Sequence, residues 1–222
     1  LGNLSDKDWV NHFGKFAPLD GNFPAPLALC YHGHQFGVYN AEIGDGRGFL
    51  FAQMWAADGR VLDLGTKGSG QTPFSRTADG RLTLKGAVRE ILATEMLEAL
   101  GVNTSKTFSV IETGETLLRH DEPSPTRAAV LVRLSHSHIR IGSFQRLRFM
   151  NDQDGLEILI RHAARHYFAE SLNAEEDIGV LAVAFLGAVA ARVADTAGAW
   201  MASGFVHGVL NTDNFNITGE SF

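Results

Sequence analysis

The sequence is 222 residues long, with 45% hydrophobic and 20% charged residues, which is typical of a chain that buries a sizeable core as one domain or as two lobes. Its net charge of -6, from 19 Lys and Arg against 25 Asp and Glu, gives no general attraction to nucleic acid or to an anionic membrane, and we expect neither as a partner. Cys30 is the single cysteine, which excludes an internal disulfide.

The ends of the sequence predict a fragment of a longer protein. The chain starts at Leu1 without a methionine and stops at Phe222 inside a stretch with a strand pattern. The longest apolar stretch, Ile178 to Val193, is rich in alanine, is interrupted by glycines and contains Arg192. We interpret it as a buried helix and not as a membrane span.

Residues 1–26 are aromatic and proline-containing and predict an irregular N-terminal segment in which one short helix is possible. The following stretch, Leu27 to Asn40, contains His32 and His34 at a spacing that metal ligands can have. Because no carboxylate or thiol accompanies them, a structural role is favoured over a metal site.

A glycine-rich turn, Gly44-Asp45-Gly46-Arg47, precedes a predicted β-hairpin. Phe49 to Trp55 forms its first strand, Asp58-Gly59 its turn, and Arg60 to Lys67 its second strand. Glycines let backbone N–H groups approach an anion closely, and an arginine adds a bidentate phosphate donor. The alternative is a plain hairpin with a glycine-rich entry.

Lys67 ends the second strand and opens another glycine-containing loop, which favours the phosphate-binding interpretation. A lysine in this order of elements is oriented by a carboxylate from a following helix. Leu84 to Leu100 has helical apolar spacing and offers Glu90 and Glu95. Glu90 is the predicted partner and Glu95 the second candidate, while a solvated helix face is the alternative for either.

Further candidate phosphate contacts are a second Asp-Gly-Arg sequence and two arginines. Asp79-Gly80-Arg81 repeats the Asp-Gly-Arg of the first turn before the predicted helix. It is either a simple turn or a second nucleotide contact near a helix N-terminus. Arg133 and Arg140 flank a predicted connection between two lobes, where phosphate binding and surface solvation are equally consistent with the spacing.

The order of predicted elements indicates an α+β fold with two lobes. Residues 105–119 and 127–135 have strand patterns, whereas Leu156 to Phe168 and Ile178 to Met201 have helical patterns. We therefore place a sheet-rich lobe in residues 1–142 and a partial helical lobe in residues 143–222.

Near the end, Gly204 to Asn214 reads GFVHGVLNTDN, and Phe215 and Ile217 then alternate with polar residues as in a strand. The order is similar to a kinase catalytic loop, in which Asp and Asn side chains hold magnesium and steer a nucleophile. Asn211, Asp213 and Asn214 are the polar side chains that this loop offers.

Taken together, several stretches resemble the selenoprotein O family of pseudokinase-like protein adenylyltransferases. They are HQFG from His34, GDGR from Gly44, LGTKGSGQTPFSR from Leu64, DGR from Asp79, REILATEMLEALG from Arg89, RLSHSHIRIGSF from Arg133, and GFVHGVLNTDN from Gly204. The resemblance covers most of residues 27–217, in order.

The resemblance implies a protein-kinase-like fold that binds ATP in a flipped orientation and transfers AMP to hydroxyl side chains of proteins, with Mg²⁺ or Mn²⁺ as the metal. It implies that Asp213 accepts the proton and that Asn214 is a metal ligand. The implied nucleotide contacts are Gly44, Gly46, Arg47, Lys67, Asp79, Gly80, Arg133 and Arg140.

Val209 stands where a usual kinase has its catalytic Asp, counting back from Asn214. Valine cannot accept a proton, which disfavours ordinary phosphotransfer. In the family a second acidic metal ligand follows, and here it is expected just after Phe222, so we expect these residues alone to be nearly inactive. Ordinary phosphotransfer and a non-catalytic nucleotide-binding module remain the alternatives. A bacterial cytoplasmic protein is expected, or a mitochondrial one in a eukaryote.

Overall fold

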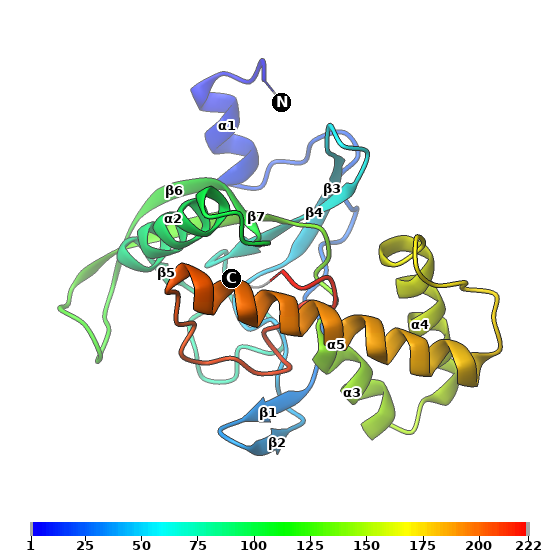
Figure 1. The fold of residues 1–222 in the computed structure, drawn as a ribbon. Helices are drawn as coiled ribbons and strands as arrows, with labels where there is room; N and C mark the ends of the chain where they lie inside the picture. Colours follow the sequence, from blue (N-terminus) through cyan, green and yellow to red (C-terminus); the bar gives the residue numbers. More distant parts are fainter. Residues whose placement is uncertain (1, 221–222) are drawn as a thin grey trace.

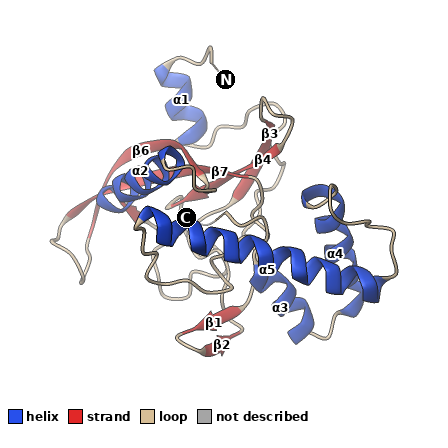
Figure 2. Ribbon diagram, viewed as in Figure 1, coloured by secondary structure: helices blue, strands red, loops and turns tan. Residues whose placement is uncertain are grey.

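The computed structural model describes residues 2–220 and contains helices and strands in a mixed order (Figures 1 and 2). The helices are α1 (Asp6–Phe13), α2 (Leu84–Ala99), α3 (Ile141–Phe149), α4 (Gln153–Tyr167) and α5 (Ile178–Ser203). The strands are β1 (Gly33–Gln35), β2 (Val38–Asn40), β3 (Leu50–Trp55), β4 (Val61–Lys67), β5 (Leu82–Thr83), β6 (Lys106–Leu117) and β7 (Thr126–Ser135). The α+β class predicted from the sequence is confirmed.

The central strand of the main antiparallel sheet is β7. Its Leu131 pairs with Lys67 of β4, and its Ala129 pairs with Leu82 of β5, so β4 and β5 share one edge of β7. Ala129 also pairs with Glu112 of β6, which therefore lies on the opposite edge. The β3–β4 hairpin that the sequence predicted is present and extends the sheet beyond β4. Lys67 thus lies at the end of a strand that is paired on both sides.

Consecutive residues of β7 point to opposite faces of the sheet, and each face is covered. Leu131 belongs to a buried cluster with Ala87 of α2, whereas Val132 belongs to a cluster with Phe13 of α1. Leu131 and Val132 are both fully buried. The helix α2 begins where the sequence predicts, because Thr83 caps it by accepting a hydrogen bond from the N–H of Gly86. This packing fixes the direction in which α2 presents its side chains to β4.

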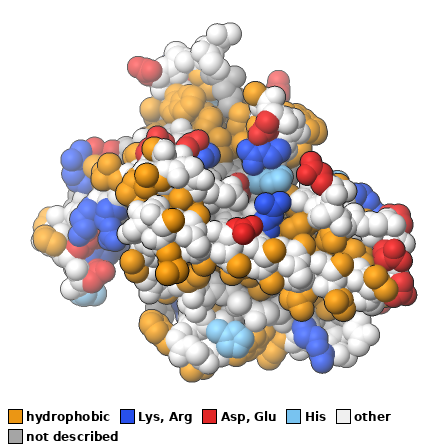
Figure 3. All heavy atoms as spheres, in the orientation of Figure 1, with side chains coloured by type: hydrophobic (Ala, Val, Ile, Leu, Met, Phe, Trp, Pro, Cys, Tyr) orange, Lys and Arg blue, Asp and Glu red, His pale blue; other side chains and the backbone are white. Residues whose placement is uncertain are grey.

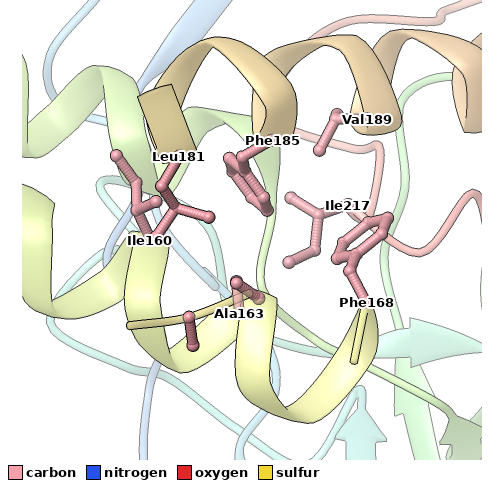
Figure 4. Close-up of a cluster of buried hydrophobic side chains, with 9 residues drawn as sticks. Ile160, Ala163, Phe168, Leu181, Phe185, Val189 and Ile217 are labelled. Carbon is pink, nitrogen blue, oxygen red and sulfur yellow. The ribbon is translucent and has the colours of Figure 1, made fainter. Parts of the chain in front are cut away.

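The remaining helices pack beside the sheet around a second core (Figure 4). Ile160 and Phe168, from α4 and its end, contact Leu181 and Phe185 of α5, and Ile217 closes the cluster. The segment around Ile217 does not form the predicted strand. It forms only a bridge between Asn216 and Arg140, and residues 215–220 are instead buried as a turn-rich segment against α5. Packing, rather than strand pairing, explains the alternating apolar side chains there.

The expectation that α5 is buried all round is wrong. Its buried residues lie on one side and include Leu181, Phe185 and Val189, whereas the side chains of Val183 and Leu186 are 75% and 70% exposed. In Figure 3 apolar side chains gather along this helix. By length and composition α5 could also cross a membrane, and the core helices of soluble proteins have the same length and composition. In the most apolar part of α5, 17% of the residues are buried. Hydrophobicity on every side of a helix does not decide which sides are covered.

Candidate active site

A cleft of about 920 Å³ lies where the sheet, the glycine-rich turn and the loop after α5 meet. Every nucleotide contact that the resemblance implies lies in its wall, although these residues come from segments far apart in the sequence. Asp213 and Asn214 line the same cleft. The cleft thus brings together all the implied nucleotide contacts with Asp213 and Asn214.

The glycine-rich turn is held against the loop that follows Lys67. A side chain at Gly44 would overlap the ring of Phe74, with a Cβ only 2.5 Å from the nearest ring atom, and one at Gly48 would lie 2.0 Å from the carbonyl oxygen of Thr66. The N–H of Gly68 donates to the carbonyl of Arg47 over 2.7 Å. Glycine is therefore required by close backbone approach, which places Arg47 beside the end of β4.

Lys67, Glu90 and Arg133 form a buried ionic triad in the wall of the cleft. Lys67 Nζ donates to one carboxylate oxygen of Glu90, and Arg133 Nη2 donates to the other. The structure thus pairs Lys67 with Glu90, whereas Glu95 is exposed. Sequence spacing alone could not reveal that Arg133 shares the same carboxylate, because that contact depends on the pairing of β4 with β7.

Burial and mutual charge interactions shift the pKa values of Lys67 and Glu90 in the triad. Burial, and then the neighbouring Arg133, lower the pKa of Lys67 to about 7. Burial would raise the pKa of Glu90, but Arg133 and Lys67 outweigh it and hold the pKa at about 2. Below about pH 7 a single carboxylate therefore faces two cations, which leaves net positive charge in the cleft for an anion.

The outer part of the cleft contains an ion pair that the sequence did not indicate. Both guanidinium Nη atoms of Arg119 donate to the carboxylate of Asp79, over 2.8 and 3.2 Å. The sequence predicts Arg119 as the last residue of the strand over residues 105–119, but β6 ends at Leu117 and Arg119 belongs to the connection between β6 and β7. Gly80 has a φ of 71° and packs against the backbone of Gly70, so the Asp-Gly-Arg repeat forms a tight turn at the cleft wall. Only tertiary folding brings Arg119 to this turn.

The loop after α5 begins at Gly204, which caps the helix with a φ of 71°. Asn214 closes the loop on itself, because its Oδ1 accepts from the N–H of Asn211 over 2.8 Å and its Nδ2 donates to the carbonyl of Val209. Asp213 is packed against Gly33, where an added Cβ would lie 2.7 Å from that of Asp213. Oδ1 of Asp213 is buried and has no hydrogen-bond partner among the described residues.

An unpartnered buried carboxylate oxygen is able to accept a cation or a hydrogen-bond donor. Residues 2–220 contain no group of three or more His, Cys, Asp or Glu side chains that could hold a metal ion. Asp213 and Asn214 could supply oxygen ligands, and magnesium commonly takes its other ligands from water and substrate phosphates. The two histidines considered in the sequence do not join this set. Nδ1 of His32 lies 2.9 Å from the hydroxyl of Tyr39, consistent with a structural role.

Comparison with known proteins decides the family. The sequence profile described as "Protein adenylyltransferase SelO" matches residues 2–222. The chain belongs to the SelO family. SelO relatives named "Protein nucleotidyltransferase YdiU" from Synechocystis sp. and Trichormus variabilis are each 52% identical to it over 219 residues. A relative with the same name from Methylorubrum populi is 42% identical over 196 residues.

The SelO relatives are longer than this chain. The alignment with the Synechocystis protein covers 99% of this chain and 45% of the relative, and that with the Trichormus protein covers 99% and 44%. The alignment with the Methylorubrum protein covers 88% and 38%. The chain thus spans about half the length of these bacterial relatives. It belongs to a family of nucleotidyltransferases.

Proposed function

We propose that the whole protein transfers AMP from ATP to Ser, Thr or Tyr hydroxyls of protein substrates, on a protein-kinase-like fold. The observation that carries the proposal is the convergence of Arg47, Lys67, Arg133 and Arg140 with Asp213 in one cleft. Cations on the sheet side suit a polyphosphate, and a carboxylate on the opposite loop suits proton removal from a hydroxyl. The family membership supports the adenylyl group as the part transferred.

In the proposed reaction the acceptor hydroxyl oxygen attacks the α-phosphorus of ATP. A new P–O bond forms, the bond from the α-phosphorus to the bridging oxygen breaks, and pyrophosphate leaves. Asp213 accepts the hydroxyl proton, while Lys67, Arg47, Arg133 and Arg140 stabilise the charge that develops on the leaving group. Lys67 is held in place by Glu90.

Asp213 and Asn214 would hold a magnesium or manganese ion, whose chemistry there is to neutralise phosphate charge. Val209 lies in the loop where a usual kinase has its proton acceptor, and its apolar side chain cannot accept a proton. This supports a loop suited to adenylyl transfer instead of ordinary phosphotransfer. We place the protein in a bacterial cytoplasm, in line with its bacterial relatives.

Labelled ATP tests the proposal in a chain of the relatives' full length. We expect label from the α-phosphate to reach protein, and label from the γ-phosphate to remain in pyrophosphate. Incorporation of γ-label would show ordinary phosphotransfer. Binding of ATP with no transfer of either label, by a protein whose Asp213→Ala variant behaves identically, would indicate the non-catalytic binding module.

A further inference from the structure

Tyr31 contacts both phosphate-binding sides of the cleft. Its side chain is buried, with 7% of the residue exposed, and it lines the cleft wall. Its hydroxyl donates to Oδ1 of Asp45 in the glycine-rich turn over 2.9 Å. The guanidinium carbon of Arg140 lies 5.8 Å from the centroid of its ring, within the range of a cation–π interaction. A single side chain therefore joins the turn that carries Arg47 to Arg140.

The backbone on both sides of Tyr31 is fixed to the same two regions. Cys30 forms an antiparallel bridge with Gly44, and the N–H of His32 donates to the carbonyl of Gly142 over 3.0 Å. A Cβ at Gly142 would lie 1.9 Å from the carbonyl oxygen of His32, so this approach is as close as a glycine permits. The ring of Tyr31 thus has a fixed position relative to the glycine-rich turn and to the start of α3.

The hydroxyl of Tyr31 is a constant donor. Burial, and then the neighbouring carboxylate of Asp45, raise the pKa of Tyr31 far above its usual range, so that the phenol keeps its proton at neutral pH. It therefore serves neither as a base nor as an ionised nucleophile. The role of Tyr31 must therefore lie in its effect on Asp45 and Arg140, the groups that it contacts.

Arg140 depends on few other protein contacts for its orientation. Its Nη1 donates to Oδ1 of Asn216 over 3.0 Å, while its Nε is buried without a hydrogen-bond partner in the part of the chain that the structure describes. The ring of Tyr31 is the aromatic surface against this guanidinium. Removing the ring would leave Arg140 free to take other rotamers, and the glycine-rich turn would lose its hydroxyl tie.

We propose that Tyr31 is a positioning residue for the polyphosphate of the nucleotide. Its ring orients Arg140, and its hydroxyl holds Asp45, so that Arg47 and Arg140 keep a fixed separation across the phosphates. The inference rests on the proposed function, since it requires a polyphosphate in this cleft. Tyr31 acts through these two contacts and does not itself take part in the transfer.

The test distinguishes the effect of the Tyr31 ring from that of its hydroxyl, and effects on phosphate binding from effects on nucleoside binding. Tyr31→Phe and Tyr31→Leu are made in the full-length protein, and the dissociation constants of ATP, ADP, AMP and adenosine are measured by calorimetry. We expect Tyr31→Phe to weaken ATP binding about 3- to 10-fold, the usual effect of one hydrogen bond. Tyr31→Leu also loses the cation–π contact and should weaken it about 10- to 50-fold. The loss should shrink from ATP to AMP, and adenosine should bind as before.

Tyr39→Phe is the matched control, because it removes a hydroxyl that bonds to His32 and to the backbone of Gln145 outside the cleft. It should leave the ratio of ATP to adenosine affinity unchanged. Equal losses for ATP and adenosine in the Tyr31 variants, or ATP affinity within about 2-fold of the wild type in both, would overturn the inference. If Tyr31→Leu does not fold, the ligand series of Tyr31→Phe decides. Failure of the unaltered protein to bind ATP would instead refute the proposed function.

Discussion

The sheet and the helical region of this chain differ in how much of their apolar surface is buried. In the sheet, residues 128–132 of β7 are each at most 3% exposed, with α1 and α2 covering opposite faces. In the helical region, α5 buries one side and leaves Val183 75% exposed on the other. The sheet is thus buried on both faces. The helical region is buried only where α4, α5 and the segment around Ile217 pack together.

The same difference recurs inside the cleft. On the sheet side, both oxygens of Glu90 are engaged by Lys67 and Arg133. On the loop side, Asp213 has a buried oxygen with no partner among residues 2–220. The groups that would bind the phosphates are thus arranged before any ligand arrives, and the group that would do the chemistry still has bonding capacity. Under the proposed function, nucleotide binding and AMP transfer would therefore depend on different regions of this chain.

The largest effect should come from removing the proton acceptor. In the full-length protein, Asp213→Asn should lower label transfer by about 10²- to 10⁴-fold, the usual contribution of a positioned base, with the affinity for metal-free ATP kept within about 3-fold. Asp195→Asn, an exposed residue of α5 outside the cleft, is the control. The measurements are transfer of α-labelled ATP and calorimetric ATP binding. Equal loss of binding and transfer would break the proposed division between the two regions.

The difference in packing predicts a difference in stability. Leu131→Ala, in the fully buried centre of β7, should lower the free energy of unfolding by about 2–5 kcal/mol because it leaves a cavity. Val183→Ala, on the exposed side of α5, should change it by less than about 0.5 kcal/mol in the 222-residue chain. Urea unfolding curves of both variants test this. A large cost at Val183 would mean that its side of α5 is covered in solution.

Glu220 forms a buried contact between the helical region and the sheet, and its titration predicts a pH dependence of stability. Its carboxylate accepts from the N–H of His136 at the end of β7, and burial raises its pKa to about 7. Between pH 4.5 and about 7 the folded state therefore holds a proton that the unfolded state releases, and stability falls as the pH rises. Glu220→Gln removes this fall.

We expect the Glu220→Gln variant to be more stable than the wild type by about 2–3 kcal/mol at pH 8 and equal to it at pH 4. The free energy of unfolding at several pH values measures the difference. Glu175→Gln, whose side chain is 76% exposed, should show no comparable change. Parallel pH profiles for the wild type and Glu220→Gln would contradict the buried, protonated carboxyl.

The smallest effect concerns the charge of Lys67. Since burial and Arg133 lower its pKa to about 7, it loses its proton as the pH rises above that value, and the cleft loses a positive charge. ATP affinity should then fall about 3- to 10-fold between pH 6.5 and 8.5, because one charged hydrogen bond is lost. Lys67→Arg, whose guanidinium stays charged, should lack this part of the dependence. Identical pH profiles for the two proteins would contradict the titration of Lys67.

Most of the local elements and the family could be predicted from the sequence. An apolar run with an Asp-Gly turn predicted the β3–β4 hairpin, and strand and helical patterns predicted β6, β7, α2, α4 and α5, all within a few residues, because these signals are local to each element. The order of glycine turns, Lys67 and GFVHGVLNTDN identified the SelO family, and the family profile confirms it. The strand predicted at Phe215 and Ile217 failed because alternation arises equally in a buried irregular segment.

The contacts between distant residues could not be predicted from the sequence, because they depend on how the elements pair and pack. The pairing of β4 with β7 brings Arg133 to the carboxylate of Glu90, and the crossing of residues 30–32 between the glycine-rich turn and α3 brings Tyr31 to Arg140. Neither contact has a signature in local spacing, because partners separated by tens of residues are set by strand register and packing. The exposed side of α5 follows from the same cause. Composition shows that a helix is apolar, and only its neighbours show which side they cover.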